Sequence, residues 1–267
     1  MNETRPLLTP VDQSGSPERF GYSWAMFPDV QAEQEVLFDG WVSALPPHTW
    51  QNAYILDAGC GNGRNSVWAN MRGAKYCMGI DIDGRSIGAA YNNMVLRGIG
   101  SSSLQSLYNI GAHRSFDIVM CLGVLHHLAE PSRALSEMVK VCKPGGIILL
   151  WVYGKENMGW YVKMMSLVRS GITSRLPMVC NVFIAVIAAV ILKVIVQLEM
   201  YSLEYFSVLG TMSFRHLVLI CLDQLLPKIS FHWTGEEIKN MCSQLGLSDI
   251  KAVHVNGMSW SISCRVP

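Results

Sequence analysis

Short apolar runs recur along most of the chain, and each is short enough for one buried strand. Two of them end in an acid, at Asp57 and at Asp81, and two others cover residues 116–121 and 147–152. Between the last two, apolar residues over 131–143 recur at spacings of three and four, the pattern of an amphipathic helix. Strands that alternate with helices predict an α/β fold with a mostly parallel sheet.

The pattern changes near the C-terminus. Residues 248–255 and 258–266 resemble two strands, and Asn256-Gly257 separates them. An Asn-Gly pair between two such runs is the strongest short-range signal of a β-hairpin. We therefore expect the sheet to end in an antiparallel pair of strands.

A segment of about eighty residues, 153–233, is more apolar than the rest and is not needed by such a sheet. Its centre is an apolar run of eleven residues, 182–192, followed by Lys193. A helix of that run is roughly 16 Å long, short of the roughly 30 Å of a bilayer core. We interpret it first as a buried lid helix or a homodimer interface. A peripheral membrane contact through 178–198 is the second interpretation and a transmembrane span the third.

The N-terminal part divides into two segments. Residues 1–17 are polar and interrupted by prolines, which predicts a disordered tail, and they lack the apolar segment of a signal peptide. Residues 18–46 hold a group of aromatic side chains, including Trp24, just before Asp29. Asp29 is a plausible N-cap for a helix over 30–44. This segment either packs on the core or forms a lid over a ligand.

Composition and charge exclude several classes of protein. The net charge is +1, so no basic footprint for nucleic acid is present. The eight cysteines are scattered without a C-x-x-C pair, so neither a metal site nor a disulfide framework is expected. We expect a reduced, cytoplasmic protein, with membrane association through the apolar segment as the alternative.

The loop after the first strand carries the clearest chemistry. Asp57 is followed by glycines at 59, 61 and 63. This loop lets a ligand approach bare backbone, and Asp81 follows the next strand, where a carboxylate can hold a ribose. A dinucleotide fingerprint would need a third glycine where Arg64 stands, and the charge of Asp57 would repel a pyrophosphate.

These motifs resemble the class I S-adenosylmethionine-dependent methyltransferases of the type 11/12 kind. The stretch 122–128 after the fourth strand and Lys143-Pro144-Gly145-Gly146 before the fifth resemble the same family. The resemblance covers 53–152 and 234–266. It implies a Rossmann-like, seven-stranded, mostly parallel sheet with an antiparallel terminal hairpin. It also implies a helical insertion between the fifth strand and the last helix.

The resulting organisation has five consecutive parts. They are a tail (1–17), a helical lid (18–46), a cofactor-binding core (47–152), an apolar helical insertion (153–233) and the end of the core sheet (234–267).

The resemblance implies S-adenosylmethionine as the cofactor, and its chemistry suits the two acids. Asp57 suits the ammonium side of the cofactor, and Asp81 suits the ribose diol. No Asp or Glu occurs in 101–114 to hold the adenine amino group, so Asn109 or the backbone carbonyls near Leu107 and Tyr108 are stand-ins. The candidate cofactor-binding residues are Trp24, Asp57, Gly59, Cys60, Gly61, Gly63, Asp81, Ile82, Asn109 and Leu122.

The predicted function is methyl transfer to a small or lipid-like acceptor, at oxygen or carbon. The stretch 121–124 lacks the N/D-P-P-Y tetrapeptide of enzymes that methylate base amines or glutamine amides. The apolar insertion favours an apolar acceptor over a charged polymer. Two alternatives are a protein methyltransferase and a non-catalytic S-adenosylmethionine-binding protein.

Histidines are the candidate general bases for a hydroxyl or carbon acceptor. His126 and His127 follow the fourth strand, and His216 and His232 lie in the insertion. We take His127 as the first candidate, then His126 and His232. A structural role at the junction of loop and helix is the competing interpretation of His127.

Overall fold

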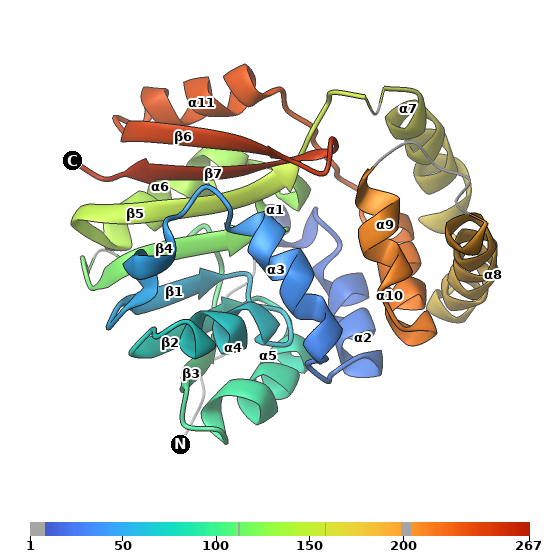
Figure 1. The fold of residues 1–267 in the computed structure, drawn as a ribbon, viewed down its shortest axis with the longest axis horizontal. Helices are drawn as coiled ribbons and strands as arrows, with labels where there is room; N and C mark the ends of the chain where they lie inside the picture. The colour runs from blue at the N-terminus through green and yellow to red at the C-terminus, as the bar shows by residue number, and fades with distance from the viewer. Residues whose placement is uncertain (1–8, 112, 158, 199–203) are drawn as a thin grey trace.

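The computed structural model describes residues 9–267 except 112, 158 and 199–203. The described residues form one seven-stranded sheet with the order β3-β2-β1-β4-β5-β7-β6 (Figure 1). Strands β1 to β5 are parallel where they pair, and β7 is antiparallel to both β5 and β6. The predicted fold class is confirmed. The strands are β1 Tyr54–Ala58, β2 Tyr76–Asp81, β3 Gly100–Leu104, β4 Phe116–Leu122, β5 Cys142–Tyr153, β6 Ser248–Val255 and β7 Ser259–Arg265.

Helices cover both faces of the sheet and one end of it (Figure 1). The α-helices are α1 Pro10–Gln13, α2 Pro17–Met26, α3 Glu35–Trp41, α4 Arg64–Met71, α5 Gly84–Ala90, α6 Pro131–Val141, α7 Gly159–Val168, α8 Met178–Gln197, α9 Glu204–Gly210, α10 Phe214–Leu225 and α11 Gly235–Gln244. Single 3-10 turns are η1 Ala32–Gln34, η2 Pro47–Trp50 and η4 Leu125–His127, and π-turns are η3 Tyr91–Val95 and η5 Arg169–Thr173.

The strand runs are continuously apolar because both faces of the sheet are buried. Successive residues point to opposite faces, so Ile55 packs in one core cluster and Leu56 in the other. Ile118 and Val119 in β4 divide in the same way. The two clusters fix the register of the sheet, and this register brings the carboxyl ends of the parallel strands to one edge.

The terminal hairpin forms as the sequence predicts. Asn256 and Gly257 both have positive φ, 52° and 70°, as a type I′ turn requires, and the register leaves three residues, 256–258, between the paired Val255 and Ser259. The strands on either side, β6 and β7, are hydrogen-bonded in an antiparallel register.

The disordered tail predicted for 1–17 does not extend over its second half. Residues 10–13 form α1, and Asp12 is buried, with its carboxylate accepting hydrogen bonds from Thr9 and Ser106. A polar segment can therefore order when its acid finds donors on the core. Residues 1–8 lie outside the described part of the chain.

The helix predicted over 30–44 is shorter in the structure. The 3-10 turn η1 comes first, and α3 begins only at Glu35. Asp29 does not cap a helix, because Gln31 precedes η1 and Gln34 precedes α3; its carboxylate pairs with Arg215 of α10 at 3.3 Å. Most of the aromatic group before it belongs to α2, a helix within the segment 18–46 that the sequence predicted to be a helical lid without giving this helix its bounds.

The apolar run 182–192 is the middle of a longer helix. α8 has 20 residues and is roughly 30 Å long, so the length estimated from the run alone was too short. It continues through Lys193 because lysine is a good helix former and no glycine or proline follows within the helix. Among the described residues, α8 is the one helix whose length and apolar composition would allow it to cross a membrane.

The insertion and the N-terminal segment form a third core cluster beside the sheet. α8 and α10 pack on each other, and Leu37 of α3 and Phe20 of α2 join them. Figure 1 shows α9 and α10 between the sheet and α8. The helices of this cluster lie at the edge of the sheet where the parallel strands end.

Candidate functional site

A cavity of about 530 Å³ lies between the carboxyl ends of the strands and the insertion. Gly59, Asp81 and Leu122 line it from the strand ends, Trp24 from the N-terminal segment and Tyr205 from the insertion. This volume lies within the usual range of small-molecule sites. The site is thus built from three parts of the chain that are far apart in sequence.

The glycine loop has the backbone geometry that only glycine adopts easily. Gly59 and Gly61 have φ of 81° and 54°. A Cβ on Gly59 would lie 2.6 Å from the side chain of Val124, and one on Gly61 would lie 2.7 Å from the ring of Trp24. Gly63, the residue before α4, also has a positive φ. The loop is therefore held tightly against its neighbours, and its backbone lies close to the cavity.

Asp81 lies at the end of β2, where its carboxylate organises the loop. It accepts hydrogen bonds from the backbone N–H of Gly61 and of Asp83, each at 3.0 Å. Burial raises the pKa of Asp81 to about 6, although the hydrogen bonds from Asp83 and Gly61 oppose this rise. Ile82 and Cys60 line the cavity beside it. A carboxylate has further acceptor positions, so Asp81 fits the diol of a ribose.

Asp57 is fully buried behind the loop and does not line the cavity. Its Oδ2 accepts a hydrogen bond from the hydroxyl of Ser66 at 2.8 Å, and its Oδ1 has no partner among the described residues. Burial raises its pKa to about 7. An unpaired buried carboxylate oxygen is costly without a donor or a nearby cation, and a cationic cofactor would supply that charge.

Trp24 and Trp41 enclose the guanidinium group of Arg64, whose Cζ lies 5.0 Å from each ring centroid. All three side chains line the cavity. Arg64 is thus part of the cavity wall. In the sequence it was noted only because it stands where a dinucleotide fingerprint needs glycine. Trp24 also covers Gly61, so its position agrees with a cofactor contact from α2.

Asp223 is a functional candidate that sequence reasoning missed. It lies on α10, lines the cavity and accepts a hydrogen bond from Ser23 at 3.3 Å. Burial raises its pKa to about 7, while the charge of Arg64 and the bond from Ser23 lower it. The only signal in the sequence is a single acid within an apolar helix, and that signal does not reveal what the acid faces.

The residues proposed to hold the adenine amino group differ in whether they reach the cavity. Leu107 and Tyr108 line it, whereas Asn109 is exposed and does not. Asp12 lines the same end, hydrogen-bonded to Ser106. An acid therefore lies beside 101–114 in space, although it comes from the segment predicted to be a tail.

The candidate histidines are all poorly suited to take up a proton. His127 lines the cavity, but burial lowers its pKa to about 3, and its Nδ1 lies 2.9 Å from the carbonyl of Ile229. Burial also lowers the pKa of His126, which stacks on Tyr153 at 3.9 Å and does not line the cavity. His232 lines it and His216 does too, and burial lowers both pKa values to about 4.

A chain of polar side chains closes the insertion side of the cavity. Gln224 donates to the hydroxyl of Tyr153 at 3.0 Å and accepts from that of Tyr161 at 3.1 Å. The buried Arg169 donates to the backbone carbonyl of Gln224 at 2.7 Å. These groups hold the end of β5, α7 and α10 together and place hydroxyl groups on an otherwise aromatic wall.

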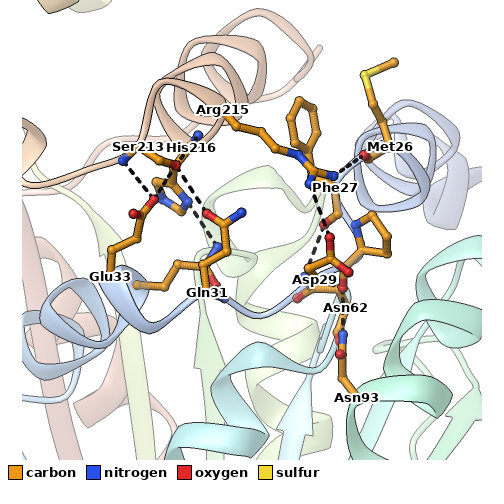
Figure 2. A network of polar contacts seen from close by, with 12 residues as sticks. Met26, Phe27, Asp29, Gln31, Glu33, Asn62, Asn93, Ser213, Arg215 and His216 are labelled. Atoms are coloured by element: carbon orange, nitrogen blue, oxygen red, sulfur yellow. Dashed lines mark hydrogen bonds and ion pairs between the residues drawn. The ribbon is translucent and has the colours of Figure 1, made fainter.

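Figure 2 shows how the segment 27–34 connects the glycine loop to α10. Asn93 donates to the carbonyl of Pro28 at 2.7 Å, and Asn62 of the loop donates to the same oxygen at 3.3 Å. On the other side, the hydroxyl of Ser213 donates to Glu33 at 2.6 Å. The segment therefore links the glycine loop directly to the insertion.

The comparisons with known proteins agree with this geometry. A family model described as a methyltransferase domain matches residues 56–150. A protein of Encephalitozoon cuniculi, provisionally named a methyltransferase, is 36% identical over 109 residues, which are 40% of this chain and 48% of that protein. The ubiquinone biosynthesis O-methyltransferase of Neisseria meningitidis is 27% identical over 107 residues, which are 38% and 44% of the two chains. The chain thus spans less than half the length of these relatives.

Among solved structures, the magnesium protoporphyrin IX methyltransferase of Synechocystis PCC 6803 with bound SAH shares the fold. Its TM-score is 0.53 at 15% identity, and the likeness covers 94% of this chain and 93% of that one. Residues 56–150 thus match a methyltransferase domain, and the described residues have the fold of the class I S-adenosylmethionine-dependent methyltransferases, which indicates S-adenosylmethionine as the cofactor.

Proposed function

We propose that this protein transfers the methyl group of S-adenosylmethionine to a small or lipid-like acceptor, at oxygen or carbon. One observation carries the proposal. A single cavity joins the glycine loop and Asp81 to an aromatic compartment built by the insertion. The O-methyltransferase name of a relative supports a hydroxyl acceptor.

When bound, the cofactor supplies an electrophilic methyl group on a sulfonium. The protein has to align the acceptor with that carbon and exclude water. Asp81 would hold the ribose from one side, and Trp24 would cover the loop from the other. Tyr153, Tyr161 and Tyr205 would shape the acceptor compartment, since all three line the cavity.

Asp223 is the general base that we propose for a hydroxyl acceptor. Its pKa of about 7 lies near neutral pH, where a base combines availability with proton affinity. His127 and His232 line the same cavity, but their lowered pKa values make them weak bases. We therefore assign the proton-accepting role to Asp223 on α10 and not to His127 in the loop after β4.

The test measures formation of S-adenosylhomocysteine by the purified protein with a panel of phenols, including prenylated ones. Asp223→Asn should lower turnover about 10²- to 10⁴-fold, and the rise of the wild-type rate with pH through about 7 should be absent in the variant. His127→Ala and His232→Ala should each stay within a few fold of wild type.

Two results would contradict these assignments. Equal turnover of Asp223→Asn and wild type would exclude Asp223 as the base. Tight binding of S-adenosylhomocysteine without turnover of any acceptor class would favour a non-catalytic binding protein.

A further inference from the structure

The helix α8 is apolar around its whole circumference, but only one side of it is covered. Asn181, Ala185, Ala189 and Val196 are the buried residues of this helix, on the side packed toward α10. The large apolar residues of the helix that stay exposed, at 46–71%, are Val179, Phe183, Ile187, Val190, Ile191 and Val194, and Leu198, directly after the helix, is exposed by 62%. A helix that is apolar all round is normally surrounded by protein or lipid, and soluble monomers rarely leave such a patch bare.

α7 extends this surface. Trp160 and Leu167 are exposed by 71% and 73%, and Met164 and Ile172 are exposed beside them. Figure 1 shows α7 and α8 together at the edge of the molecule farthest from the sheet. We call the exposed apolar residues of 159–198 the outer face.

The charged residues within 159–198 all have one sign. Residues 159–198 contain no Asp or Glu, and Lys163 and Arg175 are exposed while Lys193 is half-buried. Such a surface is complementary to anionic lipid headgroups. A second copy is a poorer match, because a two-fold interface through this face would bring the same cations together.

The cavity reaches the outer face. Trp160 and Met164 line the cavity and are also exposed to the outside, and Leu192 of α8 lines it as well. Its mouth is therefore framed by residues of the outer face.

We propose that the outer face docks on an anionic lipid bilayer and so places the mouth of the cavity at the acyl chains. α8 would lie along the surface, because its other side stays packed on α10 and Lys193 can reach the headgroups. A lipid-like acceptor could then enter the cavity from the membrane. This last step rests on the proposed function, whereas the docking itself does not.

The test uses the protein of residues 1–267 and vesicles of phosphatidylcholine with or without phosphatidylglycerol. Wild type should co-sediment with the anionic vesicles, and the double variant Phe183→Glu/Ile191→Glu should lose at least tenfold in apparent affinity. The matched control is Met71→Glu/Leu96→Glu, which charges two residues that are equally exposed, at 66% each, on the core domain. Lys163→Glu/Arg175→Glu should weaken binding to anionic vesicles and leave the apolar face intact.

The position of the mouth is tested with brominated acyl chains, which quench nearby tryptophan. Quenching should fall in Trp160→Phe, and unchanged quenching would contradict a mouth at the acyl chains. Absent vesicle binding by wild type, or equal loss in the outer-face and control variants, would overturn the docking. A dimer in light scattering that dissolves in Phe183→Glu/Ile191→Glu, without vesicle binding, would make a second copy the occupant.

Binding of S-adenosylhomocysteine, measured by calorimetry for every variant, separates the two proposals. Vesicle binding by a protein that does not bind this compound would contradict the proposed function alone. Retained binding in the outer-face variants shows that they are folded, so their loss of vesicle affinity reports on the surface.

Discussion

Single residues at the strand ends decide what the cavity can hold. Asp81 is the clearest example, because its carboxylate both organises the glycine loop and lines the cavity. The same side chain that orders the backbone is thus available to the cofactor.

Asp81→Ala should weaken binding of S-adenosylhomocysteine by about 1.5–3 kcal/mol, roughly 10- to 150-fold, because a hydrogen-bonded charged group is lost. Isothermal calorimetry measures this directly. Asp117→Ala serves as the control, since Asp117 pairs with Lys143 at the other end of the sheet and does not line the cavity. Unchanged affinity of the Asp81 variant would exclude the ribose assignment.

Asp12 gives a prediction about the adenine end. If its carboxylate accepts the adenine amino group, wild type should prefer S-adenosylhomocysteine over its deaminated inosine analogue, and Asp12→Ala should lose that preference. Calorimetry with both compounds measures the ratio of the two affinities. Ser106→Ala is the control, because it removes the hydrogen bond to Asp12 and keeps the carboxylate. A preference that survives in Asp12→Ala would show that the adenine amino group is held elsewhere.

At the scale of elements, one short segment connects the glycine loop to the insertion. The segment 27–34 has little regular structure, and side chains from both sides hold it (Figure 2). The N-terminal elements are thereby coupled to α10, which carries Asp223.

Asn93→Ala removes the donor shared by the carbonyls of Pro28 and Asn62. We expect amide hydrogen exchange in 27–34 to become faster and the affinity for S-adenosylhomocysteine to fall by roughly 3- to 30-fold, since a buried carbonyl loses its partner. Asn70→Ala, which removes a half-buried side-chain hydrogen bond from α4 to the carbonyl of Ala74, should leave both quantities unchanged. Faster exchange without any change in affinity would mean that the segment does not cover the cofactor.

For the whole molecule, buried titratable groups make stability depend on pH in opposing ways. The raised pKa of Asp57 means that the folded state keeps a proton that the unfolded chain releases. This carboxyl therefore costs stability increasingly as pH rises from about 4 to about 7, and the cost is constant above that. The lowered pKa values of His216 and His232 act in the opposite direction, because their stability contribution is lost as pH falls below 6.5.

Asp57→Asn isolates one side of this balance. Relative to wild type, the variant should gain stability between about pH 4 and 7 and show a constant difference above pH 7, on the order of 1–4 kcal/mol. Thermal melts of the cofactor-free protein across this range measure it. Asp117→Asn should show the opposite sign, because partial burial of Asp117 is outweighed by its pair with Lys143, which holds its pKa below the usual value. A difference for Asp57→Asn that does not vary with pH would contradict the buried carboxyl.

Much of the fold could be predicted from the sequence because the signals are local. Apolar runs, the Asn-Gly turn and the spacing of the glycines with Asp57 and Asp81 are properties of contiguous residues. From these signals the sheet, the terminal hairpin and the glycine loop could be predicted. The edge strand β3 was missed because its sequence, Gly-Ser-Ser-Ser-Leu, is polar and carries no strand signal.

Only the tertiary structure decided which distant residues share the cavity. Asp12, Arg64 and Asp223 stand far apart in the chain, and nothing in their neighbours indicates that they meet at one site. The same is true of the histidines, whose suitability as bases depends on burial rather than on residue type. The exposed side of α8 also follows only from packing, because a helix that is apolar all round has no sequence pattern to show which side faces protein.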